Sequence, residues 1–124
     1  MTIPVEPKRG YVYKIKIDFP DRPAQSNEKH MVIVIQSDEL KQQKNFNVAM
    51  ITSNTSYIRA RFNVPLPSNT LSGQPELSKI KCDFLYVVTR DKLRSGEYCG
   101  QIPDIVMSKI DDAIIFSLGL LENE

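Results

Sequence analysis

The sequence predicts a small, mostly β domain that ends in a single α-helix. Two short apolar runs, at 31–35 and 48–51, are rich in apolar and β-branched residues and indicate adjacent central strands buried on both faces. Two further segments, at 11–19 and 57–64, alternate between apolar and polar residues and indicate strands with one face on the core. Consecutive short strands favour antiparallel pairing, so we expect a sheet or small barrel with the helix packed on it.

Length and composition narrow the class of protein. A chain of 124 residues suffices for one domain with its own core, so we expect a single domain over residues 1–124. A composition of 41% apolar and 25% charged residues is typical of globular proteins, and we expect a cytoplasmic one with reduced cysteines. No apolar segment approaches the roughly 18–20 residues that span a bilayer. The net charge is only +1, so nucleic-acid binding would require a local basic face.

The first half of the chain supplies the first strand and the two central strands. The first strand is expected to begin after Gly10 and to end at the prolines of 20–23, because proline cannot donate to a β-ladder. A polar loop then leads to Lys29, where the first central strand starts. Between the central strands, the segment 37–40 is expected to form a capped helical turn.

The second alternating segment carries a candidate basic surface. Its apolar residues point one way, and Tyr57, Arg59 and Arg61 share the other face of the expected strand. The stretch 65–78 is rich in Pro, Ser, Gly and Asn, which favours a surface loop. Three short elements are expected to follow: a strand at 80–88, a helical turn at 89–93 and an edge strand at 97–101.

The one clear helical pattern lies near the C-terminus. Its start is expected at Pro103 or Asp104, because proline is tolerated in a first turn and an early aspartate suits the helix dipole. From Val106 to Ile114, apolar residues recur with the spacing of one buried helix face. Gly119 is a natural residue to end this helix.

Six short segments occur in an order and spacing that resemble the MazF/PemK toxin family, over about residues 8–120. The segments are Gly10-Tyr11-Val12-Tyr13, Val32-Ile33-Val34-Ile35-Gln36-Ser37-Asp38, Met50-Ile51-Thr52-Ser53, Cys82-Asp83, Thr89-Arg90-Asp91-Lys92-Leu93 and Leu118-Gly119-Leu120.

The resemblance implies a fold and an activity. The expected fold is a small, strongly curved antiparallel sheet, an SH3-like barrel of the MazF/CcdB kind, with a C-terminal helix. Most members are homodimeric toxins of toxin–antitoxin pairs that cleave single-stranded RNA at short sequences without a metal or other cofactor. The 2′-hydroxyl attacks the adjacent phosphate and leaves a cyclic phosphate and a 5′-hydroxyl. A cognate antitoxin neutralises the toxin by covering its RNA groove.

The chain departs from the family at one of its two main catalytic positions. His30 aligns with a family arginine, whereas the threonine or serine that closes the next strand is present as Thr52-Ser53. Phe84 and Tyr86 also stand where the family tends to have glutamine and arginine. Imidazole titrates near pH 6.5, so His30 is the candidate acid and base for a cyclising cleavage. The structural alternative is that His30 simply opens a strand near solvent.

The remaining candidates are residues that bind phosphate or bases. The hydroxyls of Thr52 and Ser53 can stabilise the charge that builds on phosphate oxygens, and Lys29 adds a positive charge beside His30. The candidate RNA-binding residues on the expected basic strand face are Arg59, Arg61 and Tyr57, because arginine binds phosphate and tyrosine stacks on unpaired bases. Their structural alternatives are strand termination and a soluble sheet face.

Two functions of different classes are therefore open. The first is a metal-independent endoribonuclease with His30 and Thr52 as catalytic residues. The second is a binding protein on the same fold that lost catalysis with the arginine. Such a protein would bind nucleic acid, an antitoxin-like peptide or, as a related toxin fold does, DNA gyrase.

Overall fold

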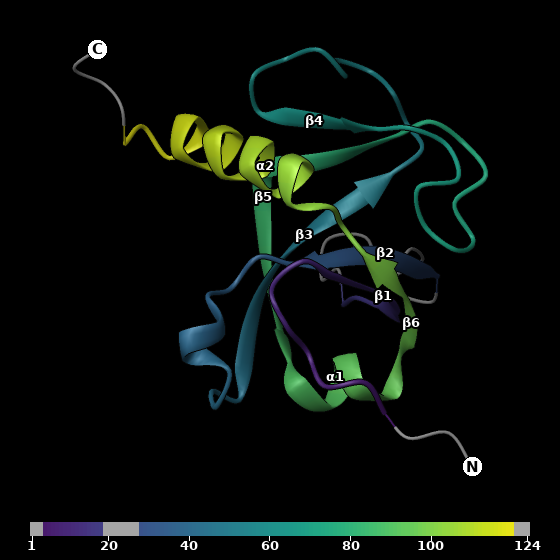
Figure 1. Ribbon diagram of the computed structural model, residues 1–124, viewed down its shortest axis with the longest axis vertical. Helices are drawn as coiled ribbons and strands as arrows, with labels where there is room; N and C mark the ends of the chain where they lie inside the picture. Colours follow the sequence, from purple (N-terminus) through teal and green to yellow (C-terminus); the bar gives the residue numbers. More distant parts are fainter. Residues whose placement is uncertain (1–3, 19–27, 121–124) are drawn as a thin grey trace.

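The computed structural model describes residues 4–18 and 28–120, and within them six strands form one curled antiparallel sheet (Figure 1). The order of the strands across the sheet is β4-β5-β3-β2-β1-β6. The mostly β fold with a C-terminal helix is thus confirmed. The elements are β1 (Tyr11–Lys16), β2 (Lys29–Val34), the 3₁₀ helix η2 (Asp38–Leu40), β3 (Asn45–Thr52), β4 (Asn63–Leu66), β5 (Ser78–Thr89), α1 (Arg90–Ser95), β6 (Glu97–Gln101) and α2 (Asp104–Ser117).

Strands β2 and β3 are the centre of the sheet, as their apolar runs predicted. They pair antiparallel, with Met31 opposite Ile51 and Val34 opposite Val48. Alternate residues of each strand enter two different hydrophobic clusters, so both faces of these strands are buried. Continuous apolar sequence is the pattern expected of strands covered on both sides.

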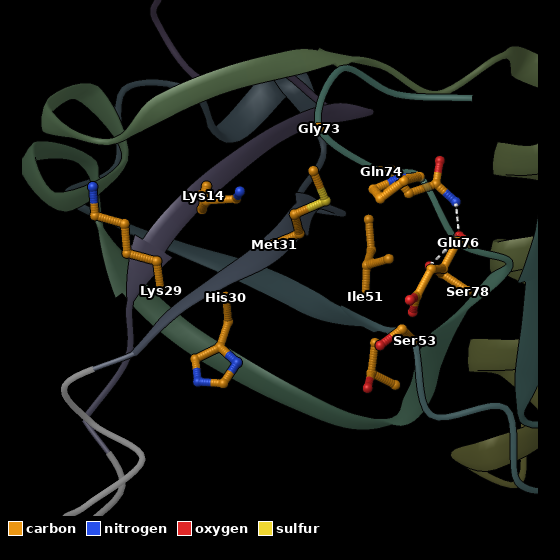
Figure 2. Close-up of a pocket in the computed structure, with 12 residues that line it drawn as sticks. Lys14, Lys29, His30, Met31, Ile51, Ser53, Gly73, Gln74, Glu76 and Ser78 are labelled. Atoms are coloured by element: carbon orange, nitrogen blue, oxygen red, sulfur yellow. Dashed lines mark hydrogen bonds between the residues drawn. The ribbon is translucent and has the colours of Figure 1, made fainter. Parts of the chain in front are cut away.

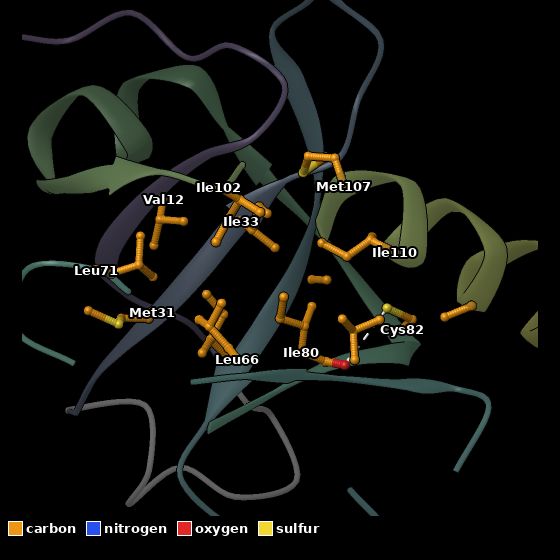
Figure 3. Packing of buried hydrophobic residues seen from close by; sticks show 14 of the residues in the cluster. Val12, Met31, Ile33, Leu66, Leu71, Ile80, Cys82, Ile102, Met107 and Ile110 are labelled. Atoms are coloured by element: carbon orange, nitrogen blue, oxygen red, sulfur yellow. Dashed lines mark hydrogen bonds between the residues drawn. The ribbon is translucent and has the colours of Figure 1, made fainter. Parts of the chain in front are cut away.

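The larger cluster lies between the sheet and α2 (Figure 3). Helix α2 contributes Met107, Ile110 and Ala113 to this cluster, and packs over β4 and β5. Its start at Asp104 after Pro103, its buried stripe and its end before Gly119, which has a φ of 72°, agree with the sequence prediction.

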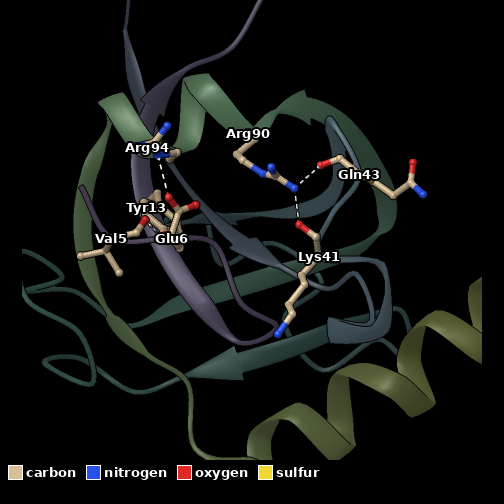
Figure 4. A network of polar contacts seen from close by, with 7 residues as sticks. All are labelled: Val5, Glu6, Tyr13, Lys41, Gln43, Arg90 and Arg94. Atoms are coloured by element: carbon tan, nitrogen blue, oxygen red, sulfur yellow. Dashed lines mark hydrogen bonds and ion pairs between the residues drawn. The ribbon is translucent and has the colours of Figure 1, made fainter. Parts of the chain in front are cut away.

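The smaller cluster lies on the other face of the sheet and includes Tyr13, Phe46 and Leu93 of α1. Polar contacts hold the N-terminal arm beside this cluster (Figure 4). The hydroxyl of Tyr13 donates to the carbonyl of Val5 over 2.8 Å, and Arg94 forms a 3.0 Å ion pair with Glu6. Val5 and Glu6 of the N-terminal arm therefore lie against β1 and α1.

The predicted strand at 57–64 is wrong. Residues 54–62 form consecutive turns, and β4 begins only at Asn63. Tyr57 adopts a left-handed φ of 57°, and the backbone N–H of Ala60 donates to its carbonyl over 2.9 Å. The polar sequence Thr-Ser-Asn-Thr-Ser before this segment favours turns through side-chain-to-backbone hydrogen bonds, and it outweighs the apolar alternation. Pro65 is accommodated because β4 is an edge strand.

Gly96 joins α1 to β6 and packs closely against β1, which leads to a stability prediction. A Cβ atom on Gly96 would lie 2.5 Å from Cγ2 of Ile15 and 2.9 Å from the carbonyl oxygen of Lys14. We expect Gly96→Ala to lower the free energy of unfolding by about 1–3 kcal/mol, because β6 or Ile15 must move to relieve the overlap. Chemical denaturation of both proteins measures this difference. An unchanged denaturation midpoint would show that β6 shifts away from β1 without cost.

Candidate functional site

The polar ends of β2 and β3 meet at a pocket of about 270 Å³, which we call the strand-end pocket (Figure 2). Four of the seven predicted site residues line it: Lys29 and His30 from β2, and Thr52 and Ser53 at the end of β3. Strand ends are rigid supports for such groups, because their backbone is fixed by pairing on the buried side.

Strand register explains why His30 and Thr52 come together. The pairing of Met31 with Ile51, continued by one residue, places His30 opposite Thr52. Side chains alternate between the two faces of a strand, so both belong to the face opposite to Met31 and Ile51. The pocket is lined by all four residues and therefore wraps around the end of the two strands.

The two sides of the pocket differ in chemistry. Figure 2 shows Lys14, Lys29 and His30 on one side of the apolar side chains of Met31 and Ile51. Ser53, Glu76 and Ser78 lie on the other side. The arrangement offers cationic groups facing hydroxyl groups and one carboxylate, over an apolar floor. Such a set of groups can hold a phosphate and move protons around it.

The loop between β4 and β5 forms one wall of the pocket and is organised by Gln74. Only 4% of this residue is exposed, and its carboxamide is saturated with hydrogen bonds to the backbone. Oε1 accepts from the N–H groups of Thr70 and Leu71, both over 3.1 Å. Nε2 donates to three carbonyl oxygens, those of Leu66, Pro67 and Glu76, over 3.2, 2.9 and 3.0 Å.

The turn after β3 is fixed by local and long-range hydrogen bonds. The hydroxyl oxygen of Thr52 accepts from the N–H of Asn54 over 3.2 Å, which leaves the Thr52 O–H available as a donor toward a ligand. From β5, the buried ammonium of Lys79 donates to the carbonyl of Ser56. Asn63 Nδ2 donates to the carbonyl of Tyr57 over 2.8 Å. Ser53 is therefore presented by an anchored turn.

The other three predicted site residues do not line this pocket. Tyr57 is 79% exposed, and Arg59 is exposed on the same turn. The guanidinium of Arg61 lies 4.2 Å from the centre of the Phe116 ring, in a separate cleft beside α2. Because residues 57–62 form turns and no strand, these three side chains do not share one strand face as expected. An RNA-binding role for them stays a prediction.

The two cysteines are poorly placed for nucleophilic chemistry. Both are free and buried. Burial, reinforced by the nearby carboxylates of Asp83 and Asp111, raises the pKa of the Cys82 thiol to about 12. Burial also raises the pKa of Cys99, with Glu97 as a further cause. A thiol is a weak nucleophile unless it is ionised.

Within residues 4–18 and 28–120, no cluster of three or more His, Cys, Asp or Glu side chains is arranged to hold a metal ion. In the same residues, no helix has the length and apolar character needed to cross a membrane.

Neither Glu76 nor Lys14 was among the site residues that the sequence predicted. Both line the strand-end pocket because distant segments fold onto the ends of β2 and β3. Lys14 stands opposite Met31 in the β1–β2 pair, and opposite residues share a face of the sheet. Alternation along β1 already placed Lys14 on one face with Val12, whereas no local pattern marked Glu76.

Solved structures share this fold. A mycobacterial endoribonuclease in complex with its cognate antitoxin matches with a TM-score of 0.72 and 20% sequence identity, over 92% of this chain and 96% of that chain. The Mycobacterium tuberculosis toxin MazF-mt6 matches with a TM-score of 0.68 and 16% identity, over 87% and 95%. A MazE–MazF structure from Deinococcus radiodurans matches with a TM-score of 0.68 and 15% identity, over 93% and 97%. No curated protein sequence matches the chain.

The curled sheet with its C-terminal helix is therefore the fold of the MazF toxins. The sequence agrees at the level of the family. The model of the PemK-like, MazF-like toxins of type II toxin–antitoxin systems matches residues 8–118, and the chain belongs to that family.

Proposed function

We propose that the protein is a metal-independent endoribonuclease that cleaves single-stranded RNA at short sequences and leaves cyclic phosphate and 5′-hydroxyl ends. The observation that supports this most is the strand-end pocket, which gathers His30, Thr52, Ser53 and Lys29 at the end of two rigid strands. Membership of the toxin family adds independent support.

In the proposed reaction, His30 handles the protons. Its imidazole takes the proton of the 2′-hydroxyl as that oxygen attacks the adjacent phosphorus. The bond between phosphorus and the 5′-oxygen breaks, and the same proton passes to the departing oxygen. The products are a 2′,3′-cyclic phosphate and a 5′-hydroxyl. The proposed step therefore consumes no water and requires no metal ion.

The other residues of the pocket stabilise charge. Two negative charges build on the non-bridging oxygens of the pentavalent phosphorus, and the hydroxyls of Thr52 and Ser53 donate to them. Lys29 and Lys14 contribute positive charge from the other side of the strands. Donors held in place before the reaction are effective because they need not reorganise as charge develops.

An RNA digestion in EDTA tests the proposal. We expect wild-type protein to cut a long single-stranded RNA at discrete positions, with 5′-hydroxyl ends, when all divalent ions are chelated. Thr52→Ala is expected to slow cutting by about 10²–10³-fold, the effect of removing one donor to developing charge. Primer extension maps the new ends. Thr55→Ala, an exposed position on the following turn, is the matched control that should leave the rate unchanged.

A second function is favoured by the replacement of the family arginine with His30. A protein without that group would bind nucleic acid, an antitoxin-like peptide or another protein, and would not cut. Folded wild-type protein that leaves several RNAs intact over a range of pH would support this function and rule out the nuclease.

We further propose that the protein acts in the cytoplasm as a homodimer and is neutralised by a cognate antitoxin. The support comes from the family and from relatives of the same fold solved with an antitoxin or as MazE–MazF. Light scattering tests the dimer. Toxicity on expression, relieved when a small neighbouring gene is expressed with it, tests the antitoxin.

A further inference from the structure

A second pocket, of about 380 Å³, adjoins the strand-end pocket and shares Lys14 and Lys29 with it. Lys16 and Lys92 also line this second pocket, which we call the lysine pocket. Lys16, Lys29 and Lys92 are exposed, and Lys14 is half-buried. The two pockets together form a path from the ends of β2 and β3 to the side of α1.

The fold brings these four lysines together from three elements. Lys14 and Lys16 are two residues apart on β1, so they share one face with Cα atoms about 6.6 Å apart. Lys16 pairs with Lys29 of β2, which places both on that face. Lys92 comes from α1, which packs against β1.

The edge of β1 is open at this point. Pairing between β1 and β6 ends at Lys14 and Glu97, so among residues 4–18 and 28–120 no strand pairs with the rest of β1 on that edge. The pocket is lined there by Ser95, Gly96 and Glu97, where α1 passes into β6. Glu97 is the one carboxylate among the lining residues, against four ammonium groups.

None of the four lysines is neutralised by an ion pair within the part of the chain that the structure describes. The ion pairs found there join Arg9 to Asp111 and Arg94 to Glu6. Four ammonium groups gathered around a single carboxylate still repel one another, and this repulsion is relieved by an anion. Lysine binds phosphate as a point charge with three donors, which suits a flexible chain of phosphates.

We propose that the lysine pocket binds backbone phosphates of the RNA strand on one flank of the bond that the strand-end pocket cleaves. This inference rests on the proposed function and extends it from the cleaved phosphate to its neighbours. Because Lys14 and Lys29 border both pockets, a strand that leaves the first meets the second without crossing uncharged surface. Phosphate contacts of this kind position a strand without reading its bases.

Binding of a non-cleavable single strand tests the proposal independently of cleavage. The probe is a 2′-O-methyl RNA oligonucleotide that contains the mapped cleavage sequence, or a mixed sequence if none is found. The test protein carries Lys16→Ala and Lys92→Ala. The control carries Lys41→Ala and Lys44→Ala, which removes the same charge from exposed positions elsewhere. Fluorescence anisotropy gives the affinity of each protein at several salt concentrations.

We expect the test variant to bind more weakly than wild type at low salt and to depend less on salt. Each phosphate contact to a single strand contributes a slope of about −0.7 to the plot of log affinity against log salt, so two lost contacts reduce the magnitude by about 1.4. The control should keep the wild-type slope. If wild type cleaves RNA, the test variant should raise KM on a long substrate and leave kcat unchanged.

Other outcomes separate the two proposals. Cleavage by wild type with an unchanged slope in the test variant would overturn the lysine pocket and leave the nuclease intact. RNA binding that weakens in the test variant, with no cleavage by wild type, would support the pocket and overturn the nuclease. A test variant that loses affinity for polyglutamate but not for RNA would assign the pocket to an acidic peptide and overturn the proposal.

Discussion

Replacing His30 with alanine is expected to lower the rate of RNA cleavage by about 10²–10⁴-fold, the range that a positioned acid–base group contributes. The half-buried imidazole lies at the start of β2, where strand register sets it opposite Thr52. An alanine there would leave the phosphate donors in place but would remove the group that moves the proton. Single-turnover cleavage with excess protein measures the chemical step directly.

The pH dependence distinguishes proton transfer from a structural role. Measured from about pH 5 to 8, the wild-type rate should vary if His30 transfers the proton, and the residual rate of His30→Ala should not. His30→Arg introduces the residue type that the family resemblance implies. It should retain part of the activity, with a flat profile over the same pH range. A His30→Ala variant that cuts at the wild-type rate would show that His30 only opens the strand.

The sequence predicted the elements whose cause is local. Residues 31–35 and 48–51 each form a continuous apolar run, and such runs identify strands buried on both faces without knowledge of their partners. The start of α2 after Pro103 and its end at Gly119 follow from backbone preferences of single residues. The pocket residues at the ends of β2 and β3 were found because strand ends can be recognised in the sequence.

The parts that sequence reasoning missed depend on segments that are distant along the chain. The turn at 54–62 is fixed partly by Lys79 of β5, and without that contact the alternation of 57–64 looks like a strand. The lysine pocket exists because α1 packs against β1 and brings Lys92 to the pocket that Lys16 also lines. Such contacts leave no periodic signal in the sequence.

Loss of the Gln74 carboxamide is expected to have the largest effect on stability among substitutions near the site. Gln74→Ala would remove five hydrogen bonds, and the two buried ones, to the N–H of Leu71 and the carbonyl of Leu66, are expected to cost most. The N–H of Thr70 and the carbonyls of Pro67 and Glu76 keep other partners. An unsatisfied buried polar group costs about 1–3 kcal/mol. Because water can reach part of the loop once the side chain is gone, we expect a total loss of about 3 kcal/mol in the free energy of unfolding. The melting temperature should fall by about 10 °C.

Gln74→Glu separates the lost hydrogen bonds from lost packing, because the two side chains have nearly the same shape. An introduced carboxylate would face the carbonyl oxygens of Leu66, Pro67 and Glu76 as a further acceptor, and burial would raise its pKa above the unfolded value. Stability relative to wild type should therefore be lost as pH rises from about 4 to 7, as the buried group ionises. Thermal unfolding of both proteins across that range measures the difference. A variant as stable as wild type at pH 7 would mean that the loop is held by its backbone turns alone. In that case Gln74→Ala should also leave the wall of the strand-end pocket, and RNA cleavage, unchanged.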